Sequence, residues 1–360
     1  MEYDMRDRFM MDSHKLLWHL DRVNEWLNGG KIAPLHIDLG ITTGCNMACS
    51  YCYGVLQGRT NARHRFDMPR PALIRLLKDS KEIGVRSIAF IGEGENTLND
   101  ALYDALLYAR DIKLDVSLAT NGLLLNKERV EDTLSSLSWL RFNISAASPS
   151  SFFKIHRIKG FDSVIENIRL YVEKKRSCHF KAAIGMQMVL TRENMDDIVP
   201  LAKLGRKTGV DYLVIKPCSD DPDRRLNAPE EYHDMEDPLK EAERLSADNY
   251  KVIVRWNKIK NQGLKGFKVC YGTHFLINIS GDGSVFPCGH FFNMRRDEFR
   301  MGNIIETPLA KIVKSRRYWE AQKKICSIDV NRDCETNCRH YYVSQFLWTI
   351  KNPPEHVNFV

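Results

Sequence analysis

Short β-rich segments alternate with longer amphipathic segments from residue 34 to residue 218, and this alternation constrains the fold more than any other feature. Strands are expected at 34–41, 87–92, 114–120, 140–147, 182–191 and 212–217. Helices are expected at 70–84, 101–112, 129–137, 161–175 and 195–209. Strands separated by helical segments of about 10–15 residues indicate right-handed βαβ units and a parallel sheet. The pattern predicts an α/β fold, an open partial (β/α)6 barrel with its chemistry at the carboxyl ends of the strands.

The alternation stops in the polar, proline-bearing segment 218–238, which suggests a domain boundary. A second, smaller α+β domain rich in cysteine follows, and its residues 274–288 predict two short strands joined by a Gly-Asp-Gly turn. The expected organisation is an N-terminal helical segment (1–33), the barrel (34–225), a linker region with a strand at 249–256 (226–262), the cysteine-rich domain (263–345) and a tail (346–360). The amphipathic N-terminal helix ends at Gly29-Gly30 and is expected to pack on the fold, cover the barrel edge or dock a neighbour.

Composition is that of a soluble globular protein, with 43% hydrophobic and 28% charged residues. No apolar run is long enough to span a bilayer, and the first residues lack the apolar core of a signal peptide, so a cytoplasmic protein without membrane contact is expected. The net charge of +7 permits an anionic small-molecule substrate but does not by itself indicate nucleic-acid binding.

The loop after the first expected strand, GCNMACSYCY (44–53), holds Cys45, Cys49 and Cys52. Clustered cysteines in a cytoplasmic chain indicate metal ligands before disulfides, and soft thiolates select zinc or iron–sulfur clusters. Structural zinc sites usually close with four ligands. A [4Fe–4S] cluster also accepts three, which leaves one iron open for a ligand. The spacing of the cysteines alone is compatible with both zinc and a [4Fe–4S] cluster.

The C-x₃-C-x₂-C spacing, with Tyr51 before the last cysteine, resembles the radical S-adenosylmethionine (SAM) superfamily. The resemblance implies a [4Fe–4S] cluster on these three cysteines whose open iron is chelated by SAM. It further implies reductive cleavage of SAM to a 5′-deoxyadenosyl radical that abstracts a substrate hydrogen, and an electron donor of the flavodoxin or ferredoxin type.

Segment 90–100, FIGEGENTLND, follows the second expected strand, where the family has a Gly-rich Gly-Glu-Pro motif. Gly92, Gly94 and Glu95 match it, and the resemblance implies that they hold the SAM amino group. Asn96 replaces the proline, which removes the rigidity that proline would give this loop.

Motifs at the next strand ends also resemble the family. Asn121 lies in ATNG (119–122), Ser145 in NIS (143–145) and Arg157 in KIHRIKG (154–160), which is similar to the family's xxHxxIRG. The resemblance implies that Asn121 and Ser145 line the SAM site and that Arg157 binds the SAM carboxylate. It implies a ribose contact for Gln187 on the fifth strand.

The cysteine-rich domain contains GSVFPC, MGNI and CETNC in that order, which resembles the SPASM/twitch extension of radical SAM enzymes. The resemblance implies one auxiliary [4Fe–4S] cluster, with Cys326 as a core residue or substitute ligand. The alternative is a zinc knuckle. The expected ligands are Cys270, Cys288, Cys334 and Cys338.

Cys218 follows the sixth expected strand, at the carboxyl end where a substrate would lie. Its thiol could donate a hydrogen atom to a substrate radical, or it could simply be a buried small residue. Neighbouring Lys216 could neutralise an anionic substrate or simply end the strand.

The leading hypothesis is dehydrogenation or epimerisation of a small hydroxylated substrate such as a sugar, cyclitol or nucleotide sugar, because few residues precede the first strand for a peptide-recognition domain. A peptide-modifying maturase is the alternative within the same family. A zinc-stabilised nucleic-acid-binding protein is the alternative from another class.

Overall fold

The computed structural model describes residues 9–359, and in this part of the chain the main sheet has ten strands in the order β12-β11-β10-β1-β4-β5-β6-β7-β8-β9. Every neighbouring pair from β10 through β1 to β9 is parallel, whereas β11 and β12 run antiparallel. The strands of the main sheet are β1 (His36–Leu39), β4 (Ser87–Phe90), β5 (Asp115–Thr120), β6 (Leu137–Asn143), β7 (Ala183–Leu190), β8 (Tyr212–Pro217), β9 (Lys251–Val254), β10 (Leu276–Ile279), β11 (Ser284–Phe286) and β12 (Gly302–Asn303). The short strands β2 (Gly44–Cys45) and β3 (Thr60–Asn61) pair separately.

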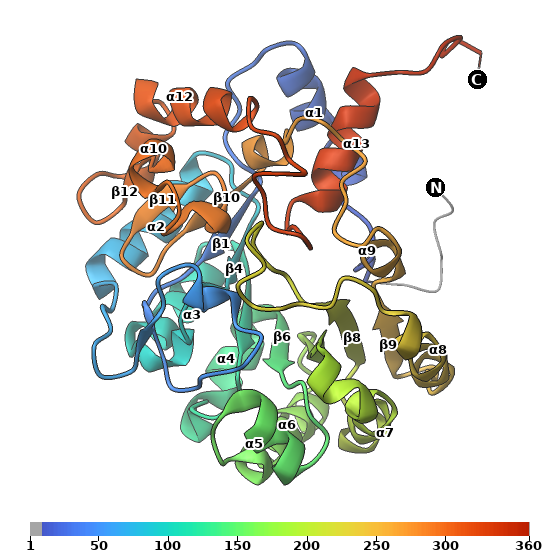
Figure 1. Ribbon diagram of the computed structural model, residues 1–360. Helices are drawn as coiled ribbons and strands as arrows, with labels where there is room; N and C mark the ends of the chain where they lie inside the picture. Colours follow the sequence, from blue (N-terminus) through green and yellow to red (C-terminus); the bar gives the residue numbers. More distant parts are fainter. Residues whose placement is uncertain (1–8, 360) are drawn as a thin grey trace.

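Helices follow the barrel strands and cover the outer face of the sheet (Figure 1). They are α2 (Arg70–Glu82), α3 (Ala101–Asp111), α4 (Val130–Ser136), α5 (Pro149–His156), α6 (Phe161–Ser177), α7 (Ile198–Thr208) and α8 (Glu236–Arg244). Buried side chains of these helices and of the strands form one continuous core, in which Leu73, Phe90 and Leu140 are fully buried. Because apolar residues fill this side, the polar residues of the strands are left for the inner face.

The alternation predicted the partial barrel correctly: β1, β4, β5, β6, β7 and β8 all lie within or next to the expected segments. The clearest shift is in β6, which begins at Leu137 rather than 140 because Leu137, directly after α4, is already extended. The sheet also continues past β8. The segment expected as a linker contains α8 and β9, and β9 adds a seventh parallel strand beside β8.

The cysteine-rich region is built onto the opposite edge of the same sheet. Its first strand, β10, pairs in parallel with β1, and the predicted hairpin to β11 turns at Gly283, whose φ of +83° favours glycine. The remaining helices are α1 (Leu20–Leu27), α9 (Trp256–Lys260), α10 (Arg296–Phe299), α11 (Leu309–Ile312), α12 (Arg316–Ile325) and α13 (Tyr341–Lys351). This pairing brings residues 270–340 beside the loop that follows β1 (Figure 1).

Helix α1 packs on this C-terminal region and does not lie over the open edge at β9. Val23 and Trp26 of α1 share a buried cluster with Phe275 and with Leu347 of α13. None of the helices in residues 9–359 is both long enough and apolar enough to cross a membrane.

Candidate active site at the carboxyl ends of the strands

The loop of Cys45, Cys49 and Cys52 leaves the carboxyl end of β1 and is clamped between the β4 loop and α5. The Glu95 amide donates to the Gly44 carbonyl at 2.8 Å, and the Ser50 amide donates to the Ile155 carbonyl at 2.9 Å. The close approach requires glycine: a Cβ atom on Gly94 would lie 2.4 Å from the Thr42 and Gly44 carbonyl oxygens, and one on Gly92 would lie 2.4 Å from the Gly40 Cα. The expected Gly92 and Gly94 therefore set the position of the cysteine loop.

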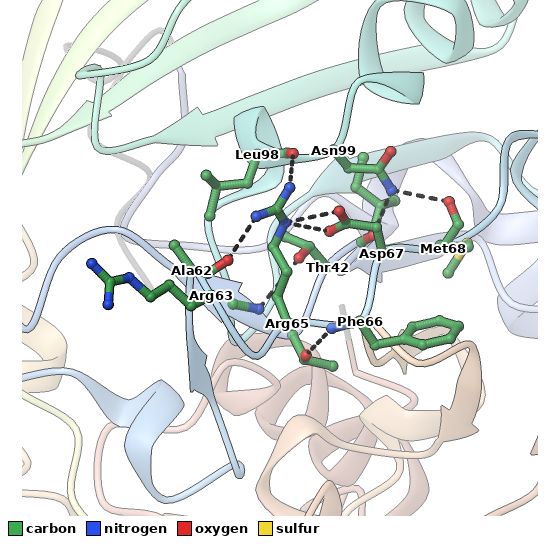
Figure 2. A network of polar contacts seen from close by, with 12 residues as sticks. Thr42, Ala62, Arg63, Arg65, Phe66, Asp67, Met68, Leu98 and Asn99 are labelled. Carbon is green, nitrogen blue, oxygen red and sulfur yellow. Dashed lines mark hydrogen bonds and ion pairs between the residues drawn. The ribbon is translucent and has the colours of Figure 1, made fainter.

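A polar network fixes the segment after the cysteine loop (Figure 2). The Arg65 guanidinium donates to both carboxylate oxygens of Asp67, at 2.8 and 3.0 Å, and to the Leu98 carbonyl at 3.4 Å. The Asn99 side chain donates through Nδ2 to the Met68 carbonyl at 3.0 Å. These contacts join segment 60–68 to the loop after β4, so the cysteine loop is held from both sides.

The three thiols of this loop influence one another. Burial raises the pKa of Cys45 to about 11, with a further contribution from Glu95. Burial also raises the pKa of Cys49, and the charges of Cys52 and Cys45 raise it further. Thiols in such surroundings ionise when a cationic metal centre compensates their charge, which is the chemistry expected of a metal-ligand set.

His156, the last residue of α5, points a ring nitrogen at one of these thiols. Its Nε2 accepts the Ser145 backbone N–H at 3.1 Å, and its Nδ1 lies 3.1 Å from the Cys49 sulfur. Burial lowers the pKa of His156 to about 4, so the ring is neutral and carries its one proton on Nδ1. His156 therefore donates a hydrogen bond to Cys49. The motif KIHRIKG (154–160) contains both residues, but the family resemblance implied a role for Arg157 only, so this contact was not predicted.

Glu95 is buried and bound by donors from two strand ends. Its Oε1 accepts from Thr120 Oγ1 at 2.7 Å and Thr97 Oγ1 at 2.8 Å, and its Oε2 accepts the Asn121 amide at 2.7 Å. Asn121 in turn donates its side-chain amide to Asn46 Oδ1 at 2.7 Å. Glu95 and Asn121 thus lie next to the cysteine loop, and Oε2 keeps capacity for a second donor.

Asn96 replaces the rigidity of the family's proline with hydrogen bonds. It is buried, accepts the Ile41 amide at 2.9 Å through Oδ1, and donates to the Leu39 carbonyl at 3.4 Å through Nδ2. The β4 loop is therefore tied to the end of β1 at the position where the sequence departs from the family pattern.

Tyr51, Ser145 and Gln187 lie on the β6–β7 side of the same edge. The Ser145 hydroxyl accepts the Val189 amide at 3.0 Å and donates to the Tyr51 hydroxyl at 3.1 Å. The Gln187 side chain donates to Asn143 Oδ1 at 3.0 Å. The Ser145 hydroxyl is therefore committed to fixing Tyr51, whose ring also packs edge-on against His156 at 5.9 Å.

Arg157 and Cys218 occupy different surroundings. Arg157 is exposed in the left-handed region (φ 58°) after α5, and its side chain forms no hydrogen bond or ion pair with the described residues. Cys218 is buried with its sulfur 3.9 Å from the Tyr51 carbonyl. Burial raises the pKa of Cys218 to about 12, so this residue holds a proton on sulfur beside the cysteine loop.

The second thiol set lies in a phenylalanine-rich core. Cys270 and Cys288 are buried there, Cys334 packs at its edge, and Cys338 is also buried. Burial raises the pKa of Cys334, with further contributions from the charges of Cys270 and Cys338. Sulfur also receives donors: the His340 amide donates to Cys338 at 3.3 Å, and Ser344 Oγ lies 3.4 Å from Cys270.

Cys326 lies beside this set, with its sulfur 3.9 Å from both the Cys270 carbonyl and His274 Nε2. It packs against the same core. This position is compatible with either expectation for Cys326, a core residue or a substitute ligand.

Glu93 connects the two cysteine regions. It is buried, and its Oε1 accepts from Ser280 Oγ at 2.7 Å and the Gly281 amide at 2.9 Å in the turn between β10 and β11. Burial raises its pKa to about 7. Glu93 was not predicted from the sequence, where the available signal was an acidic residue directly after an apolar strand.

Both thiol sets fit iron–sulfur clusters by the chemistry of their donors. In residues 9–359, no three or more His, Cys, Asp or Glu side chains lie close enough together to ligate one metal ion. A [4Fe–4S] cluster binds each thiolate through a different iron atom, so its ligands lie further apart. Soft thiols, amide N–H donors to sulfur and an apolar surround are the environment such clusters require.

Two family models match the chain. One, described as the radical SAM superfamily, matches residues 39–205, and the other, described as an iron–sulfur cluster-binding domain (SPASM), matches residues 270–340. The tungsten-containing aldehyde ferredoxin oxidoreductase cofactor-modifying protein of Pyrococcus furiosus is 22% identical over 301 residues, covering 79% of this chain and 82% of that protein. The AdoMet-dependent heme synthase of Methanosarcina barkeri is 24% identical over 334 residues, covering 85% and 91%.

Solved structures share the fold. Streptococcus suis SuiB bound to S-adenosylmethionine superposes with a TM-score of 0.61 at 18% identity, covering 90% of this chain and 78% of that one. SuiB bound to its precursor peptide SuiA gives 0.61 at 17% identity, covering 87% and 71%. Radical SAM domains use a [4Fe–4S] cluster and SAM, and SPASM domains bind auxiliary iron–sulfur clusters. The chain is therefore a radical SAM enzyme with a C-terminal SPASM iron–sulfur cluster-binding domain.

Proposed function

We propose that the protein cleaves SAM reductively and uses the resulting 5′-deoxyadenosyl radical to abstract hydrogen from a small hydroxylated substrate, which it dehydrogenates or epimerises. The observation that carries the proposal is the single loop of Cys45, Cys49 and Cys52 at the carboxyl ends of the parallel strands, with the Glu95 and Asn121 network beside it. Ten free cysteines also suit a reducing compartment, so we infer a cytoplasmic enzyme.

Cys45, Cys49 and Cys52 would hold the SAM-binding [4Fe–4S] cluster. Glu95 Oε2, with its spare acceptor capacity, would take the SAM ammonium, while Gly92 and Gly94 let the loop backbone approach it. Asn121, Tyr51, Ser145 and Gln187 would line the remaining SAM contacts, and Arg157 would have to turn inward to meet the carboxylate. When bound, the cluster supplies the electron for SAM cleavage.

Cys270, Cys288, Cys334 and Cys338 would hold one auxiliary [4Fe–4S] cluster in the phenylalanine-rich core, with Cys326 as the substitute ligand. Four thiols close the coordination of such a cluster, so the second site would not bind SAM.

Cys218 decides between the two outcomes in this proposal. Its protonated thiol lies beside the Tyr51 carbonyl, where it could give a hydrogen atom to a substrate carbon radical and so complete an epimerisation. The sulfur radical left on Cys218 then takes up one electron and one proton, with a flavodoxin or ferredoxin-type donor as the electron source. Dehydrogenation would instead leave Cys218 untouched: the substrate radical would lose one proton to solvent and pass one electron to the auxiliary cluster, completing a two-electron oxidation.

A peptide substrate is the second candidate, because SuiB, one of the structural neighbours, is described as bound to a precursor peptide. That likeness, at 17% identity, concerns the fold alone.

The first test is SAM cleavage by anaerobically reconstituted protein reduced with dithionite. We expect 5′-deoxyadenosine from the wild type and from Cys178→Ala, whose exposed cysteine lies outside both sets, and none from Cys49→Ala. Stoichiometric zinc without 5′-deoxyadenosine would contradict the proposal.

The second test identifies the substrate. Deuterated sugars, cyclitols, nucleotide sugars and peptides are incubated with the enzyme, and deuterium is measured in 5′-deoxyadenosine. Transfer from a small hydroxylated compound supports the proposal, whereas transfer only from a peptide favours the maturase.

A further inference from the structure

The inner face of the barrel carries two cations without partners. Arg141 is on β6 and Lys216 on β8. Arg141 lies between Leu140 and Phe142 in β6, and both of these neighbours are buried in the helix-covered core. Because successive side chains of a strand point to opposite faces, the Arg141 side chain projects to the inner face. Lys216 follows Ile215, which is buried in the same core, so the Lys216 side chain also projects to the inner face.

Register confirms that the two side chains share a face. Arg141 pairs with Gly185 of β7, and Gly185 pairs with Tyr212, which is on the same side of β8 as Lys216. Trp139, Arg141 and Asn143 all keep partial exposure, whereas Leu140 and Phe142 between them are buried. Arg141 therefore keeps partial exposure on this face, beside the ring of Tyr212, which lies over Gly185.

Neither cation is neutralised by the part of the chain that the structure describes. Arg141 packs its guanidinium over the Trp139 ring at 4.7 Å, and its buried Nε has no hydrogen-bond partner. Lys216 forms no hydrogen bond or ion pair with residues 9–359. Burial lowers its pKa to about 8, and the positive charges of Arg141 and Arg255 lower it further.

Within residues 9–359, three buried or partly buried acids lie nearby, and none of them forms an ion pair with Arg141 or Lys216. Glu335, whose charge raises the pKa of Lys216, accepts the Arg339 backbone amide at 3.1 Å. Asp38 on β1 accepts from Arg339 at 2.8 Å and contacts His36 at 3.0 Å. Asp12 accepts from Tyr342 and lies 3.9 Å from Arg255. Two partly buried cations without an ion-pair partner are costly to maintain, and an anionic ligand lowers that cost.

We propose that the barrel's inner face binds an anionic group of the substrate, a carboxylate or a phosphate, between Arg141 and Lys216. This deepens the proposed function and rests on it, because Lys216 precedes Cys218 by two residues and so places the anion next to the reacting centre. The guanidinium supplies a planar pair of donors and the ammonium a point charge, a combination that suits either oxyanion.

The test uses reconstituted full-length holoprotein and isothermal titration calorimetry with potassium phosphate or potassium succinate at constant ionic strength. We expect at least one probe to bind, and to bind about tenfold or more weakly to Arg141→Gln and Lys216→Gln. Arg316→Gln, whose side chain is 91% exposed, is the matched control and should bind as the wild type does. Binding of phosphate alone or succinate alone assigns the anion.

Arg141→Lys keeps the charge and should retain part of the affinity if Arg141→Gln fails to fold. Binding of neither probe to the wild type, or equal binding by all variants, would overturn the anion site. Failure of the proposed function is read separately, as absence of 5′-deoxyadenosine from the wild type.

Discussion

Cys45, Cys49 and Cys52 come from one loop and keep partial exposure, whereas Cys270, Cys288 and Cys338 are buried and come from distant segments. Polar groups surround the first set, including His156 and the Asn46–Asn121 pair, and phenylalanines surround the second. A partly exposed site with three ligands suits binding and reaction of a cosubstrate. A buried site with four suits a cluster that does not exchange ligands.

The largest expected effect is the difference between removing a ligand of the first cysteine set and removing a ligand of the second. Cys49→Ala should abolish 5′-deoxyadenosine formation and lose the iron of one cluster, while Cys334→Ala should lose similar iron but keep SAM cleavage within about tenfold. Iron analysis and product chromatography measure both. If Cys334→Ala lost SAM cleavage as completely as Cys49→Ala, the claim that only the first cysteine set is needed for SAM cleavage would be wrong.

The next largest effect is expected from truncating one buried phenylalanine near the second cysteine set and one in the barrel core. Phe291 is 1% exposed and stacks on Phe299 at 4.0 Å, and Phe142 is fully buried under the barrel helices. Alanine at either position should cost about 3–5 kcal/mol in urea unfolding. Only Phe291→Ala should reduce the iron content of the auxiliary cluster. Equal iron loss in both variants would mean that the phenylalanine-rich core has no particular role in holding that cluster.

Glu93 provides a pH test of the contact between the regions. Its folded-state pKa of about 7 lies above that of the unfolded chain, so the protonated form favours folding. Stability should therefore fall by about 3 kcal/mol as pH rises from about 4 to 7 and beyond.

Glu93→Gln keeps the carbonyl acceptor for Ser280 and should remove this loss, so that the variant is more stable than the wild type at pH 8 but not at pH 5. Urea unfolding at the two pH values measures it. Glu306→Gln, 71% exposed, is the control. If the free energy of unfolding of Glu93→Gln depended on pH as that of the wild type does, ionisation of Glu93 would not destabilise the folded protein.

The smallest effect concerns the hydrogen bond from His156 to Cys49. Removing this donor in His156→Phe should make the reduction potential of the first cluster more negative by about 60 mV, equivalent to roughly 1.4 kcal/mol for one electron. The second cluster should not shift. Redox titration followed by electron paramagnetic resonance (EPR) measures both, with exposed His64→Phe as control. Equal potentials in His156→Phe and wild type would leave His156 a packing role only.

The barrel could be predicted because its strands and helices are local patterns that each carry a full hydrophobic period. The pairing of β10 with β1 could not, since it joins residues far apart and depends on register. The same reason hid His156 and Glu93, whose partners lie on other segments. Arg141 and Lys216 did leave a signal: each is a charged residue within a strand of a parallel sheet, where apolar residues are usual.

The division between the two cysteine sets is tested most directly by EPR of the reduced, reconstituted protein with and without SAM. We predict about eight irons per chain and two cluster signals, of which SAM changes only the one lost in Cys49→Ala. About four irons, or a SAM-dependent change in the signal lost in Cys334→Ala, would contradict the assignment of an open first site and a closed second one.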